Sequence, residues 1–191
     1  MRHLRQKTIR FILITVPPAP VAEKLEILRK EFNQIAGSRI ALTYPPHITL
    51  RTGFLVPEKE IPGFVKELSC LFTEEKPFWI ETDGIHCGYY EQDSGPQPIV
   101  CFRIKKSFRL ASLNKKLLTY KRFRKSKRTS FDPHLTIAYE DLSVEGFERL
   151  KETIQRRPDI QKLQFRWRCD HAGLYIKKSE CWMAYHTFFF R

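Results

Sequence analysis

Amphipathic periodicity along the chain predicts four helices. The first begins at Pro20 and carries apolar side chains at three- and four-residue spacing as far as Gly37, a residue type that commonly ends helices. Three further helices are predicted to start near Pro57, at Ser107 and at Ser143, where serine is a favoured N-cap. Each helix has one apolar stripe, so we expect each to cover one face of a sheet or of another helix.

Short apolar or alternating runs between these helices predict strands. The expected strands span residues 10–16, 46–52, 78–87, 99–105, 131–139, 160–169, 172–177 and 181–190, with 91–98 as a loop. The order helix, strand, helix, strand, strand therefore occurs twice. It predicts an α+β fold of two pseudo-twofold-related lobes, each an antiparallel sheet with helices on its outer face, around a central cleft. We take 1–191 as one domain with an internal duplication, about 20–105 and 107–178, completed by the first and last strands.

One pentapeptide pattern is present in both predicted units. It reads Pro46-His47-Ile48-Thr49-Leu50 and returns 87 residues later as Pro133-His134-Leu135-Thr136-Ile137. Side chains alternate between the two faces of a strand, so the histidine and threonine of each copy share one face and the aliphatic residues share the other. The proline before each histidine suits the first residue of a strand. The aliphatic faces can be buried under helices, which leaves two imidazoles and two hydroxyls for the cleft.

Two histidines and two threonines in one cleft can displace a group at phosphorus without a metal. A neutral imidazole takes a proton from the attacking oxygen while an imidazolium protonates the leaving oxygen. The threonine hydroxyls can donate to the non-bridging oxygens, whose negative charge grows in the transition state. We therefore predict that His47 and His134 are catalytic and that Thr49 and Thr136 bind phosphate.

The tetrapeptides His47-Ile48-Thr49-Leu50 and His134-Leu135-Thr136-Ile137 resemble the signature of the 2H phosphoesterase superfamily. This superfamily includes the 2′-5′ RNA ligases and the 2′,3′-cyclic phosphodiesterases. The resemblance implies the two-lobed α+β fold, the same catalytic and phosphate-binding roles for these four residues, and no cofactor or metal. It also implies that His134 is the base and His47 the acid.

The leading interpretation is a metal-independent phosphoesterase that hydrolyses 2′,3′-cyclic phosphate ends of RNA or nucleotides by two-histidine acid–base catalysis, with reversible 2′-5′ RNA ligation as a further activity. One alternative is a phosphodiesterase for 2′-5′ oligoadenylate or for the cyclic phosphate of ADP-ribose. Another is a non-catalytic module that binds a nucleotide or RNA. The sequence leaves all three open.

The alternation of side chains along the strands predicts that other residues also face the cleft. Arg51 lies two residues beyond Thr49 and is predicted to bind phosphate, whereas the matching position of the second copy is Ala138. Tyr44 is favoured for stacking on a base, and Tyr139 is expected to face the core. The other substrate- or RNA-binding candidates are basic residues alternating along later strands, and members of the basic run 121–128: Arg103, Lys105, Phe123, Arg128, Arg166 and Arg168.

Composition narrows the class of protein. The 191 residues are 42% hydrophobic, which excludes a disordered chain, and the formal net charge of +13 favours RNA or another phosphorylated partner. Five scattered cysteines without a Cys-x-x-Cys pair indicate reduced thiols rather than a disulfide framework or a zinc site. No apolar run is long enough for a membrane span. We expect a cytoplasmic monomer.

Overall fold

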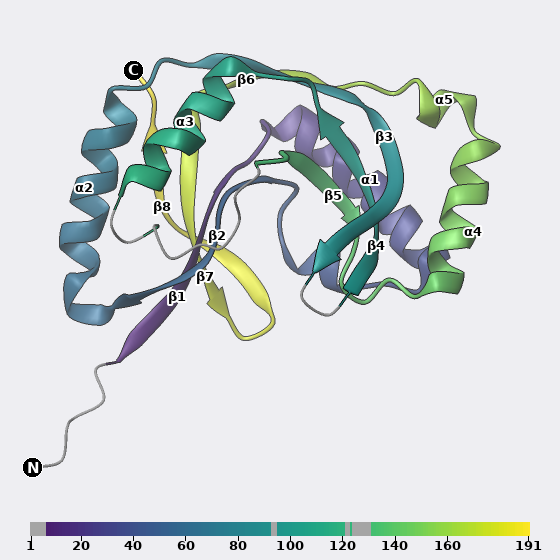
Figure 1. The fold of residues 1–191 in the computed structure, drawn as a ribbon, viewed down its shortest axis with the longest axis horizontal. Helices are drawn as coiled ribbons and strands as arrows, with labels where there is room; N and C mark the ends of the chain where they lie inside the picture. The colour runs from purple at the N-terminus through teal and green to yellow at the C-terminus, as the bar shows by residue number, and fades with distance from the viewer. Residues whose placement is uncertain (1–6, 93–94, 121–122, 124–130) are drawn as a thin grey trace, which may run out of the picture.

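The computed structural model describes residues 7–92, 95–120, 123 and 131–191. Its eight strands form one curled antiparallel sheet with the order β6-β3-β4-β5-β2-β1-β7-β8 (Figure 1). The strands are β1 (Thr8–Thr15), β2 (Ile48–Pro57), β3 (Phe78–Gln92), β4 (Gly95–Ile104), β5 (His134–Ala138), β6 (Arg166–Cys169), β7 (His171–Lys178) and β8 (Cys181–Phe189). Together with the helices, this sheet confirms the predicted α+β class.

The helices lie on two sides of the curled sheet (Figure 1). They are α1 (Ala19–Ala36), α2 (Ile61–Thr73), α3 (Phe108–Thr119), α4 (Val144–Gln155) and the short α5 (Pro158–Gln161), with 3-10 turns η1 (Ile40–Thr43) and η2 (Glu58–Glu60). Helix α1 contacts α4 and β5, whereas α2 contacts β8 and α3 contacts β2. Each half of the sheet therefore has its own helical cover, and the buried apolar residues lie between the two layers.

Local sequence signals account for three of the helix ends. Gly37 has a left-handed φ of 73° directly after α1, a conformation that costs glycine little. The Ser107 side chain accepts a hydrogen bond from the backbone N–H of Leu110, and Ser143 accepts one from Gly146, which confirms both predicted N-caps. No helix among the described residues combines the length and the apolar character needed to cross a membrane.

The two halves of the sheet meet where β2 pairs with β5. Each half takes strands from both predicted units, about 20–105 and 107–178, because β2 joins β1, β7 and β8 while β3 and β4 join β5 and β6. The lobes therefore interleave along the chain. The duplication itself and its boundaries stay a prediction.

Two stretches of the chain form a different element from the one expected. Most of the predicted loop 91–98 belongs to a β3–β4 hairpin, paired as far as Gln92 with Gly95. Pro96 and Pro98 fit this strand because β4 pairs with β5 only from Val100 onward, so no ladder bond is missed on that edge. The strand predicted over 160–169 is reduced to β6, because α5 buries Ile160 in the core.

Candidate active site

The two motifs lie on neighbouring antiparallel strands. The β2–β5 ladder pairs Ile48 with Leu135, two buried aliphatic residues of the motifs. Extending that register by one residue in each direction puts His47 opposite Thr136, and Thr49 opposite His134. Each imidazole therefore faces the hydroxyl of the other copy across the strand gap, as the predicted pseudo-twofold arrangement requires.

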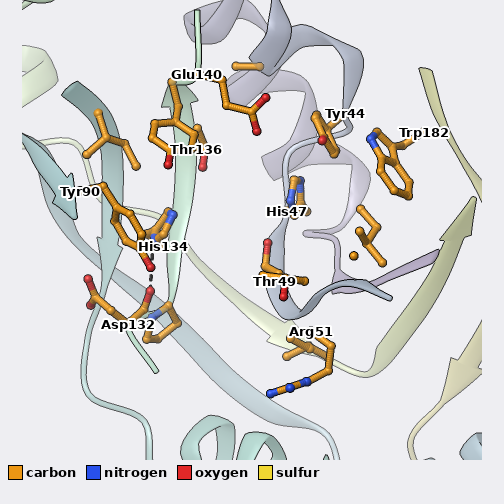
Figure 2. A pocket seen from close by; sticks show the side chains of 18 of the residues that line it. Tyr44, His47, Thr49, Arg51, Tyr90, Asp132, His134, Thr136, Glu140 and Trp182 are labelled. Carbon is orange, nitrogen blue, oxygen red and sulfur yellow. Dashed lines mark hydrogen bonds between the residues drawn. The ribbon is translucent and has the colours of Figure 1, made fainter. Parts of the chain in front are cut away.

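A pocket of about 320 Å³ opens beside this strand pair. It is lined by all four motif residues and by Tyr44 and Arg51. Figure 2 shows the motif side chains of β2 and β5 on opposite sides of the pocket, with Arg51 and Glu140 at opposite ends. The structure thus brings together six of the residues that the sequence singled out.

Both histidines are held in the same way. The Nδ1 atom of His47 lies 2.8 Å from the carbonyl oxygen of Pro45, and Nδ1 of His134 lies 2.9 Å from that of Asp132 (Figure 2 for the latter). A carbonyl only accepts, so each Nδ1 carries the hydrogen and Nε2 of a neutral ring keeps its lone pair. In both copies the acceptor precedes the histidine by two residues, with the motif proline between them.

The environment of His47 disfavours its charged form. Burial lowers the pKa of His47 to about 4, against an opposing contribution from its hydrogen bond to Pro45. The positive charges of Arg29 and His134 lower this pKa further. His47 is therefore a neutral imidazole near pH 7.

Arg29 is a pocket residue that sequence reasoning missed. Its side chain is only 2% exposed, and Nη1 donates to Glu26 Oε1 and to the carbonyl oxygen of Tyr44, each at 3.0 Å. In the sequence, Arg29 is one of several charged residues of α1 and resembles a solvent-exposed helix residue, so no pattern indicates that it lines a pocket. The carboxylate of Glu26 balances its charge, and the second bond anchors the backbone at Tyr44.

Aromatic rings stand on both sides of the pocket. The ring of Tyr44 lies 5.4 Å from His47 and stacks at 5.5 Å on Trp182, a residue of β8 that no motif had indicated. Across the pocket, Tyr90 lies 6.1 Å from His134 and 6.2 Å from Tyr139. The expectation that Tyr139 faces the core was wrong, because β5 ends at Ala138 and the alternation ends with it.

Arg51 lines the pocket but has one donor already engaged. It is 7% exposed, and its Nη2 donates to the backbone oxygen of Phe123 at 2.9 Å. Ala138, at the matching position in β5, is buried and does not line the pocket. The β2 and β5 sides of the pocket therefore differ at this position.

Phe123 is not a base-stacking residue, contrary to our expectation. It is 3% exposed and packs edge-on against Phe54 and Phe64, at centroid distances of 4.9 and 5.9 Å. A single apolar residue in a basic run can be buried as an anchor, and hydrophobic burial prevails here. Arg128, predicted in the same run, lies outside the described residues.

Four predicted cations are not part of the pocket lining. Their side chains are exposed, as parity predicted, but none lines the cavity: Arg103, Lys105, Arg166 and Arg168. Glu81 forms ion pairs with two of them, at 3.2 Å to Lys105 and 3.1 Å to Arg166, and Arg103 Nη2 lies 2.9 Å from His86 Nε2. Arg103 is nevertheless the direct neighbour of His134 in the β4–β5 ladder. Binding of substrate or RNA by these four residues stays a prediction.

The described residues contain no cluster of three or more His, Cys, Asp or Glu side chains suited to a metal ion. The chemistry that the arrangement offers comes from the two Nε2 atoms, the two hydroxyls and the nearby guanidinium groups. The absence of a metal or cofactor requirement stays a prediction.

A sequence model described as the 2′-5′ RNA ligase superfamily matches residues 17–180. The chain belongs to this superfamily. This membership confirms the resemblance to 2H phosphoesterases that the paired tetrapeptides carried.

Two relatives of this superfamily member match three quarters or more of the chain. A Bacillus cytotoxicus protein named "Putative phosphoesterase" is 28% identical over 182 residues, covering 92% of this chain and 94% of the relative. A Halalkalibacterium halodurans protein with the same designation is 29% identical over 149 residues, covering 75% and 78%. These relatives support a phosphoesterase.

Solved structures share the fold of this superfamily member. TT0787 of Thermus thermophilus superposes with a TM-score of 0.61 at 17% identity, covering 95% of this chain and 97% of the other. E. coli LigT complexed with 3′-AMP gives 0.59 at 15% identity, covering 96% and 99%. At such identities the likeness establishes the fold alone.

Proposed function

We propose that this protein is a phosphoesterase that opens 2′,3′-cyclic phosphates at RNA ends or on nucleotides by two-histidine acid–base catalysis. The observation that carries the proposal is the pairing of two His-x-Thr faces beside one pocket, each histidine presenting Nε2 through the same hydrogen bond at Nδ1.

In this mechanism a water oxygen attacks phosphorus and the bond to one ribose oxygen breaks, which gives a phosphate monoester. The neutral ring of His47 accepts the proton of the attacking water at Nε2. His134, as the imidazolium, gives its Nε2 proton to the leaving ribose oxygen. The lowered pKa of His47 favours this assignment, which is the reverse of the one implied by the resemblance.

Thr49 and Thr136 supply hydroxyl donors for the non-bridging oxygens. Each threonine lies opposite the histidine of the other copy, so a phosphate held between the imidazoles has a hydroxyl on both sides. Donors aimed at oxygens that gain charge stabilise the transition state more than the bound substrate.

Nucleotide complexes of a structural neighbour agree with this substrate class. E. coli LigT has been solved with 3′-AMP, with NADP+ and with ATP, and the three structures superpose on this chain with TM-scores of 0.59, 0.59 and 0.58. The five cysteines are all free, which suits the cytoplasmic location we propose. RNA as the partner, a monomeric state and reversible 2′-5′ ligation stay predictions.

The test is incubation with adenosine 2′,3′-cyclic phosphate and with RNA ending in a cyclic phosphate, in the presence of a chelator, resolving 2′- from 3′-monoesters. We expect turnover by the wild type and a loss of 10²-fold or more in His47→Ala and His134→Ala, as about 10²–10⁴-fold is typical for a general acid or base. His186→Ala, an exposed histidine of β8 that does not line the pocket, is the control. Wild-type rates in either motif variant would refute the mechanism.

A further inference from the structure

Arg51 is a buried cation without a counter-charge. No carboxylate pairs with it among the described residues, and its Nη2 bond goes to a neutral backbone oxygen. Its guanidinium also lies 5.5 Å from the ring of Phe123. The segment on either side of Phe123, residues 120–131, contains no Asp or Glu in the sequence. A buried charge without a partner is costly, so an anion entering the pocket would stabilise this side chain.

A second guanidinium lines the same pocket. Arg10 of β1 lines the same pocket, and no ion pair joins it to a carboxylate in the described part of the chain. A Cβ built on Gly53 would stand 2.8 Å from Arg10 Nε and 3.1 Å from Nη2, so the missing side chain of Gly53 makes room for this group. Gly53 lies two residues beyond Arg51 in β2, so the pocket has one arginine on β1 and one on β2.

Arg51 lies beyond the motif residues along β2. Arg51 follows Thr49 by two residues, or about 7 Å along a strand. Figure 2 shows its guanidinium on the side of Thr49 away from His47, while Glu140 stands at the other end of the pocket. A phosphate bound between the two histidines therefore leaves Arg51 available to bind a second anionic group. That group would lie one nucleotide step from the first phosphate and on the side of the pocket opposite Glu140.

We propose that Arg10 and Arg51 form a second phosphate subsite, which makes the preferred substrate a cyclic-phosphate nucleotide carrying a further phosphate one nucleotide step away. This inference rests on the proposed phosphoesterase function. The group recognised is a second phosphate on the 5′ side of the terminal ribose. Two kinds of substrate carry such a phosphate: an RNA 3′ end, through its last internucleotide diester, and a free nucleotide, through its 5′-phosphate.

The experiment compares kcat/KM for three substrates at fixed ionic strength. They are adenosine 2′,3′-cyclic phosphate, the same compound with a 5′-phosphate, and the dinucleotide ApA ending in a 2′,3′-cyclic phosphate. We expect at least one phosphate-bearing substrate to exceed the bare one by about 10- to 100-fold, as expected for one or two charge-assisted hydrogen bonds. Preference for the dinucleotide alone assigns the subsite to RNA, and preference for both assigns it to any second phosphate.

Three variants connect this preference to the two arginines. Arg10→Gln should reduce the ratio of the two kcat/KM values about tenfold, and Arg51→Gln should do the same in samples shown to be folded by urea unfolding. Gly53→Ala keeps every charge but displaces the Arg10 guanidinium, so it should lower the ratio about threefold. Arg156→Gln, which removes the same charge from the exposed C-terminal end of α4, is the matched control and should keep the wild-type ratio.

Failure of this inference can be told apart from failure of the function. Turnover of all three substrates with a ratio near one in the wild type would overturn the second subsite while leaving the phosphoesterase standing. Equal loss of the ratio in Arg10→Gln and Arg156→Gln would also overturn it, because net charge rather than a subsite would then set the preference. No turnover of any substrate would refute the function itself.

Discussion

The lowered pKa of His47 makes the stability of the fold depend on pH in a way that can be measured. The folded protein releases the His47 proton at about pH 4, whereas an unfolded chain releases it near 6.5. Between these values the unfolded state binds more protons, so the free energy of unfolding must rise with pH. The change amounts to about 3 kcal/mol at 1.36 kcal/mol per pKa unit.

The perturbation is His47→Asn, because the Asn side-chain N–H₂ can take the place of Nδ1–H toward the Pro45 carbonyl without carrying a titratable group. Urea unfolding of both proteins from pH 4 to 8 gives two stability curves. Their difference isolates the His47 proton, since the other titrating groups are common to both chains.

We expect the difference in unfolding free energy between wild type and variant to be constant above pH 7. As the pH falls from 6.5 to 4, it should change by up to about 3 kcal/mol to the disadvantage of the wild type. A difference that stays constant within about 0.5 kcal/mol over the whole range would refute the reasoning. It would mean that His47 is charged as readily in the folded state as in the unfolded chain, and the assignment of this residue as the base would lose its support.

Three further predictions concern the phosphate donors, the core and a helix cap. Thr49→Val and Thr136→Val should each lower kcat about 10²-fold with little change in the urea midpoint, because a lost transition-state donor is typically that costly; an unchanged kcat would exclude the hydroxyl role. Phe123→Ala should destabilise the fold by about 3–5 kcal/mol, as buried aromatic deletions do, and a loss below about 1 kcal/mol in urea unfolding would contradict its burial. Ser143→Ala should cost about 1 kcal/mol by the same assay through loss of the bond to Gly146, and a neutral result would discount this cap.

The sequence predicted the elements whose signals are local. The repeated pentapeptide indicated which residues of β2 and β5 share a face, because side-chain alternation depends only on the strand backbone. The buried Ile48 and Leu135 and the pocket-lining His47 and His134 follow that rule. Alternation ceased to predict at Tyr139, one residue beyond the end of β5.

Long-range packing decided the rest of the pocket. Arg10, Arg29 and Trp182 arrive from β1, α1 and β8, and no spacing in the sequence relates these positions to the motifs. The prediction for Phe123 was wrong because the residue lies in a basic run of the sequence. Only the tertiary structure shows that its ring packs against Phe54 and Phe64.

By itself, then, the sequence determined the two His-x-Thr pairs, the faces they occupy and the family, since each depends on short patterns and backbone periodicity. The tertiary structure alone decided which charged faces meet the pocket. Arg51 and Arg103 lie on β2 and β4, the two strands on either side of β5, yet of the two only Arg51 lines the cavity. Periodicity determines the side of a strand on which a residue lies. The curl of the sheet and the order of its strands determine whether that side faces the pocket, a helix or solvent.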